Sequence, residues 1–160
     1  ADAVMTGRLT ISEGGIADLE AVMRVMKDSF DPAYGEAWTS AQCAGLMPMP
    51  GVWLTLAREG DEVVGFALAR IVLKEAELLL LAVRRDRQAA GVGQMLLDRF
   101  ILVAASRGAD HLHLEVREGN PAMNLYLKSG FAEVGRRKNY YTGSDGQIYD
   151  ALTLTRVATI

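Results

Sequence analysis

The chain has 160 residues, of which 50% are hydrophobic and 23% are charged, and its formal net charge is −3. A chain of this length forms one ordinary domain that buries about two thirds of its extended surface, so we expect a single domain over residues 1–160. The weakly acidic charge argues against a general nucleic-acid-binding protein, which usually carries a basic face. The basic triplet Arg136-Arg137-Lys138 fits a solvated strand end.

The single cysteine, Cys43, leaves no partner for an internal disulfide and no ligand set for a cysteine-based zinc site. It favours a reducing, cytoplasmic location, and we expect it to pack in a helix rather than to act as a nucleophile. The sequence shows no apolar run of about 18 residues and no charged-then-apolar leader. Neither insertion into a membrane nor export is expected, and the chain is expected to be a monomer or a weak dimer.

Hydrophobic spacing predicts that helices and strands alternate along the chain. Ile16, Leu19 and Val22 begin a helical pattern with acidic residues near its start, where they suit the helix dipole. Thr39 or Ser40 can cap the next helix. The elements expected in the first half are a strand at 8–13, a helix at about 16–26, an aromatic-rich loop at 30–40, a short helix ending at 47, and hairpin strands at 52–58 and 63–73.

The second half of the sequence ends in a hairpin. Its expected elements are a strand at 77–83, a helix at 92–107, a strand at 111–117, a helix from about 121 to 128, and strands at 131–141 and 148–156. Gly108 and Gly130 are placed to end the two helices. This order predicts an α/β (α+β) fold with a central mixed sheet of about seven strands flanked by four helices.

The most informative segment is a strand, Leu78 to Val83, that leads through Gly91 and Gly93 into a helix. Small residues there let backbone N–H groups approach an anion at the positive end of the helix. The segment is not a Rossmann fingerprint, because Leu96 stands where a third glycine is needed, and it is not a P-loop, because Gln94-Met95 replaces the lysine and hydroxyl. It predicts a phosphate cradle, although a lone Gly-x-Gly can also be only a softened helix start.

Gln88-Ala89-Ala90-Gly91-Val92-Gly93 fits the pattern Gln/Arg-x-x-Gly-x-Gly/Ala, and here the chain resembles the GNAT acyl-CoA N-acyltransferases. The segment Leu114 to Phe131, with its Leu-Glu-Val-Arg, Leu-Tyr and Gly-Phe groups, resembles the ribosomal-protein-alanine N-acetyltransferases of that family. Arg137 to Tyr141 and Asp150-Ala151 are also similar to that group. The resemblance implies the GNAT fold, acetyl-CoA as co-substrate without a metal, and a protein or peptide N-terminus as the acceptor.

The resemblance also implies which residues hold acetyl-CoA. The strand end would contact the pantetheine arm, and the loop would hold the pyrophosphate chiefly by its backbone, because the pair that is usually basic in this group is Ala89-Ala90 here. The loop after the first helix lacks the group's Pro-Trp-Ser run, so the resemblance leaves the identity of the acceptor open. The expected acetyl-CoA-binding residues are Leu81, Ala82, Val83, Gln88, Ala89, Ala90, Gly91, Val92, Gly93, Gln94, Asn120 and Tyr126.

Acetyl transfer from a thioester to an amine needs a base for the amine, a polarised carbonyl and a proton for the thiolate. Glu115 is the expected base, since strand alternation turns it away from its apolar neighbours, although it could be only a surface carboxylate paired with Arg117. Tyr126 is the expected acid, and it could be only a packing residue beside Phe131. Asn120 can cap a helix and also bond the pantetheine arm.

A widening between the strands near Leu81–Val83 and Leu114–Val116 would expose backbone groups for the thioester, but the sequence cannot show it. Glu77 could face the acceptor amine or be a solvated strand end. The aromatic residues expected to line a peptide groove are Tyr34, Trp38, Tyr140 and Tyr141, and the acidic residues expected to attract a basic acceptor are Asp28, Asp31 and Glu36. Ordinary loop packing is the alternative for each of them.

Other functions stay open on the sequence. A small-molecule amine is the alternative acceptor. His111, His113 and Glu115 lie on one face of one strand and form a possible metal triad, but such neighbours stand about 7 Å apart, which is wide for chelation. A catalytically silent CoA-binding module is a third possibility.

Overall fold

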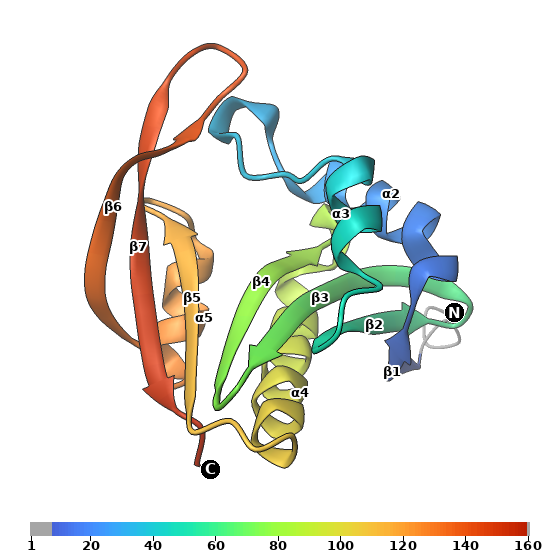
Figure 1. Ribbon diagram of the computed structural model, residues 1–160. Coiled ribbons are helices and arrows are strands. Elements are labelled where there is room, and N and C mark those ends of the chain that lie inside the picture. The colour runs from blue at the N-terminus through green and yellow to red at the C-terminus, as the bar shows by residue number, and fades with distance from the viewer. Residues whose placement is uncertain (1–7, 160) are drawn as a thin grey trace.

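The computed structural model describes residues 8–159. Over these residues seven strands form one mixed sheet in the order β1-β2-β3-β4-β5-β7-β6, with helices on both faces (Figure 1). The strands are β1 Leu9–Gly14, β2 Val52–Glu59, β3 Glu62–Val72, β4 Glu75–Val83, β5 His111–Arg117, β6 Ala132–Thr142 and β7 Ile148–Val157. The α-helices are α2 Leu19–Ser29, α3 Ser40–Leu46, α4 Val92–Ser106 and α5 Ala122–Lys128.

The predicted order of elements is confirmed, as is a mixed sheet of seven strands with four α-helices within residues 8–159. Short 3-10 helices were not predicted, because a single turn is too short to show a period. They are η1 Ile16–Asp18, η2 Pro32–Tyr34 and η3 Arg85–Ala90. The first replaces the expected first turn of α2, and β4 starts at Glu75 rather than Glu77. No helix in the described part of the chain is both long and apolar enough to span a bilayer.

Two apolar cores hold the sheet between its helices. Leu96 and Phe100 of α4 are buried on one face, and Val22 and Met26 of α2 are buried on the other. Full burial of one such side chain contributes about 1.5–3 kcal/mol. The strand residues of the second core come from β2, β3 and β4, so α2 and α3 leave the same face of β5 and β7 uncovered.

A bulge interrupts the pairing of β4 with β3. Leu68 lies opposite Leu80 and Ala69 opposite Leu78, which leaves Leu79 without a partner on β3. Leu78 packs in the α4 core, whereas Leu79 and Leu80 both pack on the α2 side. Both faces of this leucine run are therefore covered, and the bulge changes the direction of the residues that follow it.

The parallel ladder between β4 and β5 is short. It runs from Glu75–His111 to Leu78–Leu114 and then stops, although β4 continues to Val83 and β5 to Arg117. The two strands diverge toward the upper part of Figure 1. The widening that the sequence could not show is therefore present. Backbone groups on the facing edges have no strand partner there, so peptide-like groups of a bound molecule can pair with them.

Candidate active site

Helix α4 begins without a side-chain cap, beside the carboxyl end of β4. Gly91 precedes it with a φ of 83°, a left-handed conformation that glycine adopts without strain. A Cβ on Gly91 would meet no heavy atom within 4 Å, so the space beside this loop is open. The Gln88 side-chain amide donates to the Val83 carbonyl at 3.0 Å and holds the loop on the end of β4. The first-turn N–H groups and the helix dipole make this an anion-binding position.

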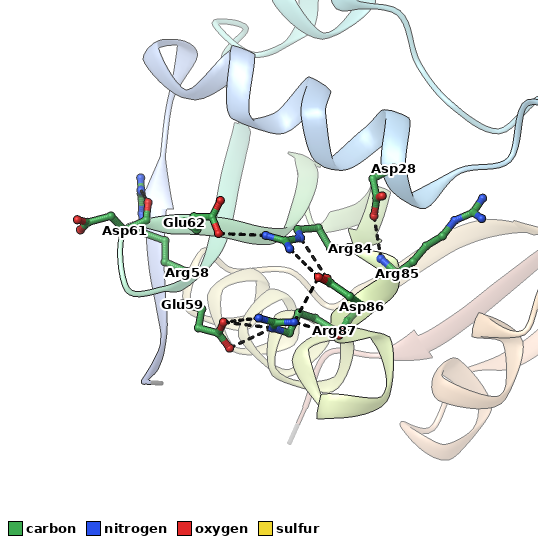
Figure 2. A network of polar contacts seen from close by, with 9 residues as sticks. All are labelled: Asp28, Arg58, Glu59, Asp61, Glu62, Arg84, Arg85, Asp86 and Arg87. Carbon is green, nitrogen blue, oxygen red and sulfur yellow. Dashed lines mark hydrogen bonds and ion pairs between the residues drawn. The ribbon is translucent and has the colours of Figure 1, made fainter. Parts of the chain in front are cut away.

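Ion pairs hold the segment before this loop against the turn between β2 and β3 (Figure 2). Arg84 donates to both carboxylate oxygens of Asp86, at 3.1 and 2.7 Å, and to Glu62 at 3.3 Å. Arg87 donates to Glu59, with a shortest distance of 2.6 Å. These hydrogen bonds lower the pKa of the Glu59 and Asp86 carboxyl groups. The guanidinium groups of Arg84 and Arg87 are thus already paired with carboxylates. This fits a loop that binds phosphate through its backbone N–H groups rather than through these side chains.

Two acidic residues that were expected to attract a basic acceptor have local roles here. Asp28, on α2, accepts a hydrogen bond from the backbone N of Arg85 at 2.8 Å, while the Arg85 side chain extends away from the network (Figure 2). Asp31 accepts from the backbone N of Ala33 at 2.9 Å and caps η2. These contacts tie the end of α2 to the loop after β4 and shape the loop after α2.

Glu115 lies on β5 just beyond the last residue that pairs with β4. Its side chain is 14% exposed, and its Oε2 lies 2.5 Å from Arg137 Nε of β6. The hydroxyl of Thr153, on β7, donates to the same oxygen at 3.3 Å. The alternative that paired Glu115 with Arg117 is wrong, because Arg117 is buried against Glu36. Glu115 therefore faces the widened part of the sheet on the side that lacks a helix.

A buried ion pair ties the loop after α2 to the end of β5. The side chains of Arg117 and Glu36 are 8% and 10% exposed, and Arg117 Nε lies 3.3 Å from Glu36 Oε1 without hydrogen-bond alignment. The guanidinium stacks 3.7 Å from the centre of the Tyr34 ring. Asn120 Nδ2 donates to Glu36 Oε2 at 2.6 Å, and Asn120 Oδ1 accepts from Ala122 N at 2.8 Å. Pro121 is the N-cap of α5, so Asn120 is not the cap itself but bonds the first residue of the helix, and its amide donor is already used by Glu36.

Tyr126 lies on α5 with only 6% of its surface exposed, and its ring packs edge-on against Phe131 with centroids 6.1 Å apart. Burial raises the pKa of its phenol far above the ordinary value, and the negative charge of Glu36 adds to this. The phenol therefore stays protonated and can donate a hydrogen bond. The sequence predicted Glu36 only as a residue that attracts a basic acceptor, and its contacts with Asn120 and Arg117 depend on the fold.

Tyr140 and Tyr141 lie at an interruption of the β6–β7 ladder. Asn139, just before them, has a positive φ of 56°, which marks the bulge. The two rings pack edge to face with centroids 4.9 Å apart. Burial raises the pKa of both phenols, and so do nearby charges, chiefly Glu115 for Tyr140 and Glu36 for Tyr141. The rings of Tyr140 and Tyr141 thus lie near the carboxylates of Glu115 and Glu36.

The other two predicted groove residues are packed differently. Tyr34 contacts Tyr149 edge-on, with centroids 5.4 Å apart, in addition to its stacking on Arg117. Trp38 is half-buried and packs partly against the core under α2 and α3. The structure therefore gathers Tyr34, Tyr140 and Tyr141 around the carboxylates, whereas Trp38 belongs in part to the core.

Glu77 and the two histidines lie along the paired part of β4 and β5. Glu77 is opposite His113, and its carboxylate accepts from Arg70 at 3.0 Å. His113 Nε2 is 3.7 Å from Glu75 Oε1, and His111 is exposed. Within residues 8–159, no three His, Cys, Asp or Glu side chains are grouped to hold a metal ion.

The sequence also matches a known family of proteins. Residues 19–131, more than half of the chain, match the family described as acetyltransferase (GNAT) family. The chain therefore belongs to the GNAT acetyltransferase family.

Individual proteins and solved structures are also similar to this chain. The chain is 41% identical over 96 residues to [ribosomal protein bS18]-alanine N-acetyltransferase of Haemophilus influenzae, a match covering 60% of this chain and 66% of that protein, just under two thirds. The crystal structure of the ribosomal-protein-S18-alanine N-acetyltransferase from Escherichia coli superposes with a TM-score of 0.85 at 30% identity, over 96% of both chains. Ard1 from Thermoplasma volcanium gives a TM-score of 0.82 at 29% identity, over 95% of this chain and 99% of that one.

Proposed function

We propose that this protein is an acetyl-CoA-dependent N-acetyltransferase that modifies the N-terminal α-amine of a protein, with Ala or Ser as first residue. The relatives named for the alanine of ribosomal protein bS18 support this acceptor class. The observation that carries the proposal is the end of the β4–β5 ladder at Leu78–Leu114, with Glu115 next in sequence on β5. Ribosomal proteins are made in the cytoplasm, which is the compartment that this function implies.

Acetyl-CoA is proposed to lie across the widened sheet, with its pyrophosphate at the start of α4. The open space beside Gly91 and the uncapped first turn of α4 support this placement. The pantetheine amides would pair with the free edge of Leu81–Val83, much as a strand would. Because Asn120 already donates to Glu36, we propose that it reaches the pantetheine arm only through a change in that contact.

The proposed reaction is a direct transfer between the two bound substrates. Glu115 accepts a proton from the α-ammonium group, and the neutral nitrogen forms a bond to the thioester carbonyl carbon. The carbon–sulfur bond then breaks, and Tyr126 donates a hydrogen bond or a proton to the leaving thiolate. The second proton of the attacking nitrogen passes to the sulfur or replaces the phenolic proton, so that a neutral amide, a thiol and a protonated Tyr126 remain. Cys43 is fully buried, and burial raises the pKa of its thiol, so an acyl-cysteine intermediate is not part of the proposal.

The acceptor is proposed to enter on the side of the sheet that lacks a helix, between the loop after α2 and the β6–β7 hairpin. Tyr34, Tyr140 and Tyr141 would form its walls, with Glu77 and part of Trp38 at the margins. The acidic groups of the loop, Asp31 among them, would attract the basic residues that ribosomal proteins carry.

Mass spectrometry of acetyl transfer tests this function directly. Peptides that begin with Ala or Ser and carry Arg or Lys soon after should be acetylated on the α-amine, at a rate that falls as salt is added, because exposed charges are screened. Free lysine and polyamines are measured in parallel. Preferential acetylation of spermidine or of lysine side chains would move the protein to the small-amine alternative. Transfer to no amine, with acetyl-CoA still bound, would indicate a non-catalytic CoA-binding module.

Gly35 allows the loop after α2 to lie on the β6–β7 hairpin. Its φ is 68°, and a Cβ there would overlap the carbonyl oxygen of Thr142. We therefore expect Gly35→Ala to lower the free energy of unfolding by about 1–3 kcal/mol. Because the loop carries Glu36, the acceptor KM should rise while the affinity for acetyl-CoA stays unchanged. Thermal unfolding and steady-state kinetics measure both effects.

The matched control is Gly45→Ala. Gly45 lies in α3, and a Cβ there would meet no heavy atom within 4 Å, so alanine should be neutral or slightly stabilising. A folded Gly35→Ala protein with the wild-type acceptor KM would show that the loop does not position the acceptor.

A further inference from the structure

The carboxylate of Glu115 already forms an ion pair with a side chain of the protein itself. Arg137 Nε lies 2.5 Å from Glu115 Oε2, and the Thr153 hydroxyl donates to the same oxygen at 3.3 Å. Within residues 8–159 both contacts use Oε2, and neither uses Oε1. A positive group beside a carboxylate that is only 14% exposed offsets part of the cost of removing its charge from water. The guanidinium thus stands where a base must receive an ammonium group.

Apart from its contact with Glu115, Arg137 is only weakly held in place. Its side chain is 63% exposed on β6, an edge strand of the sheet, and the β6–β7 register shifts directly after it. Its guanidinium also lies 5.5 Å from the centre of the Tyr140 ring. The neighbouring Arg136, in contrast, donates to both Glu118 and Asp150 at 2.7–2.9 Å. An ion pair with one partner this exposed contributes little, so another cation can replace the guanidinium.

We propose that Arg137 occupies the position of the acceptor's α-ammonium group on Glu115 in the free protein and is displaced when the acceptor binds. The inference rests on the proposed function, because it takes Glu115 as the group that receives the amine proton. The exchange keeps a positive charge beside a mostly buried carboxylate both before and after the acceptor binds, until Glu115 takes the proton. It also makes Arg137 a specificity-determining residue, because a weakly binding amine does not displace the guanidinium.

Removing the charge of Arg137 should therefore strengthen acceptor binding. Arg137→Gln eliminates both the competing cation and its repulsion of the acceptor's ammonium group. Because exposed ion pairs contribute little, the acceptor KM should fall only about two- to fivefold, which corresponds to about 0.4–1 kcal/mol. The difference should shrink as the pH rises past the α-amine pKa of about 8, because the guanidinium does not repel a neutral amine.

Other charged and titratable groups surround this pair. They are Arg70 of β3, Glu75 and Glu77 of β4, His113 of β5, Tyr140 and Tyr141 of β6, and Glu36 with Arg117 behind the tyrosines. All of them are the same in the wild type and in the variants. The ratio of the two KM values at each pH therefore isolates the contribution of Arg137.

The test is steady-state kinetics on the full chain with a peptide that begins with Ala, at about pH 6.5 and about pH 9. Lys138→Gln removes the same charge from the exposed next residue and should leave the acceptor KM unchanged. Arg137→Lys should restore most of the wild-type KM, because an ammonium group can also pair with Glu115. Calorimetric titration of the same peptide into each variant gives its affinity independently of turnover.

A lower acceptor KM for Arg137→Gln, with a larger effect at the lower pH, supports the exchange. An unchanged or higher KM overturns it, and so does a fall in kcat alone, which would make Arg137 only an orienting partner of Glu115. A wild-type protein that acetylates no amine would contradict the proposed function instead. The calorimetric affinities would then still decide whether Arg137 competes with a bound ammonium group.

Discussion

Replacing Glu115 by glutamine is expected to lower the rate of acetyl transfer at neutral pH by about two to four orders of magnitude. The amide keeps the shape of the side chain and can still accept from Thr153, but it cannot take the proton of the acceptor amine. The affinity for acetyl-CoA should be nearly unchanged, because the proposed phosphate cradle lies at the start of α4, away from Glu115. As the pH rises toward the α-amine pKa of about 8, more of the acceptor is neutral, so the variant should recover part of its rate relative to the wild type.

Glu133→Gln is the matched control for this variant. Glu133 is exposed on β6, and the same change of charge there should leave the rate unchanged. Loss of the Glu115–Arg137 pair should cost little stability, since Arg137 is 63% exposed, and thermal unfolding checks this. If Glu115→Gln kept the full rate at neutral pH, the base would have to be sought elsewhere. Glu77, on the neighbouring strand, would be the next residue to replace.

The order of elements could be predicted because it depends on local patterns. The apolar run at 78–83 shows a buried strand, and the helical spacing from Leu19 to Met26 shows which face of α2 is buried. Gly108 and Gly130 follow the ends of α4 and α5, and both have the positive φ that favours glycine there. Such signals lie within a few residues of the element they predict, so one sequence is enough to recognise them.

The arrangement of the site could not be predicted because it depends on contacts between distant residues. Sequence reasoning offered Arg117 as the partner of Glu115, since they share a face of one strand. Such neighbours stand about 7 Å apart, however, and side chains from other elements reach closer. Arg137 of β6 pairs with Glu115, and Glu36 of the loop after α2 pairs with Arg117. The unpaired Leu79 and the short β4–β5 ladder likewise result from sheet pairing, which no local spacing encodes.

Acetyl-CoA at about 100 times its Kd is expected to raise the melting temperature of the wild type by about 5–10 °C, because a ligand that binds only the folded state then contributes about 2.7 kcal/mol. Gly91→Val should abolish this shift. Its branched side chain would fill the open space beside the loop, where the pyrophosphate has to approach the first-turn N–H groups of α4. Thermal unfolding with and without acetyl-CoA measures the effect.

Gly91→Val also strains the backbone, and this effect has to be distinguished from the loss of phosphate binding. Gly108, just after the other end of α4, provides the control. Gly108 has a φ of 94°, and a Cβ there would also meet no heavy atom within 4 Å, so Gly108→Val carries a comparable penalty of about 1–2 kcal/mol. It should lower the melting temperature as Gly91→Val does and yet keep the full acetyl-CoA shift. A folded Gly91→Val protein with the wild-type shift would contradict the cradle, and an equal loss of shift in Gly108→Val would show that the shift reports strain rather than phosphate binding.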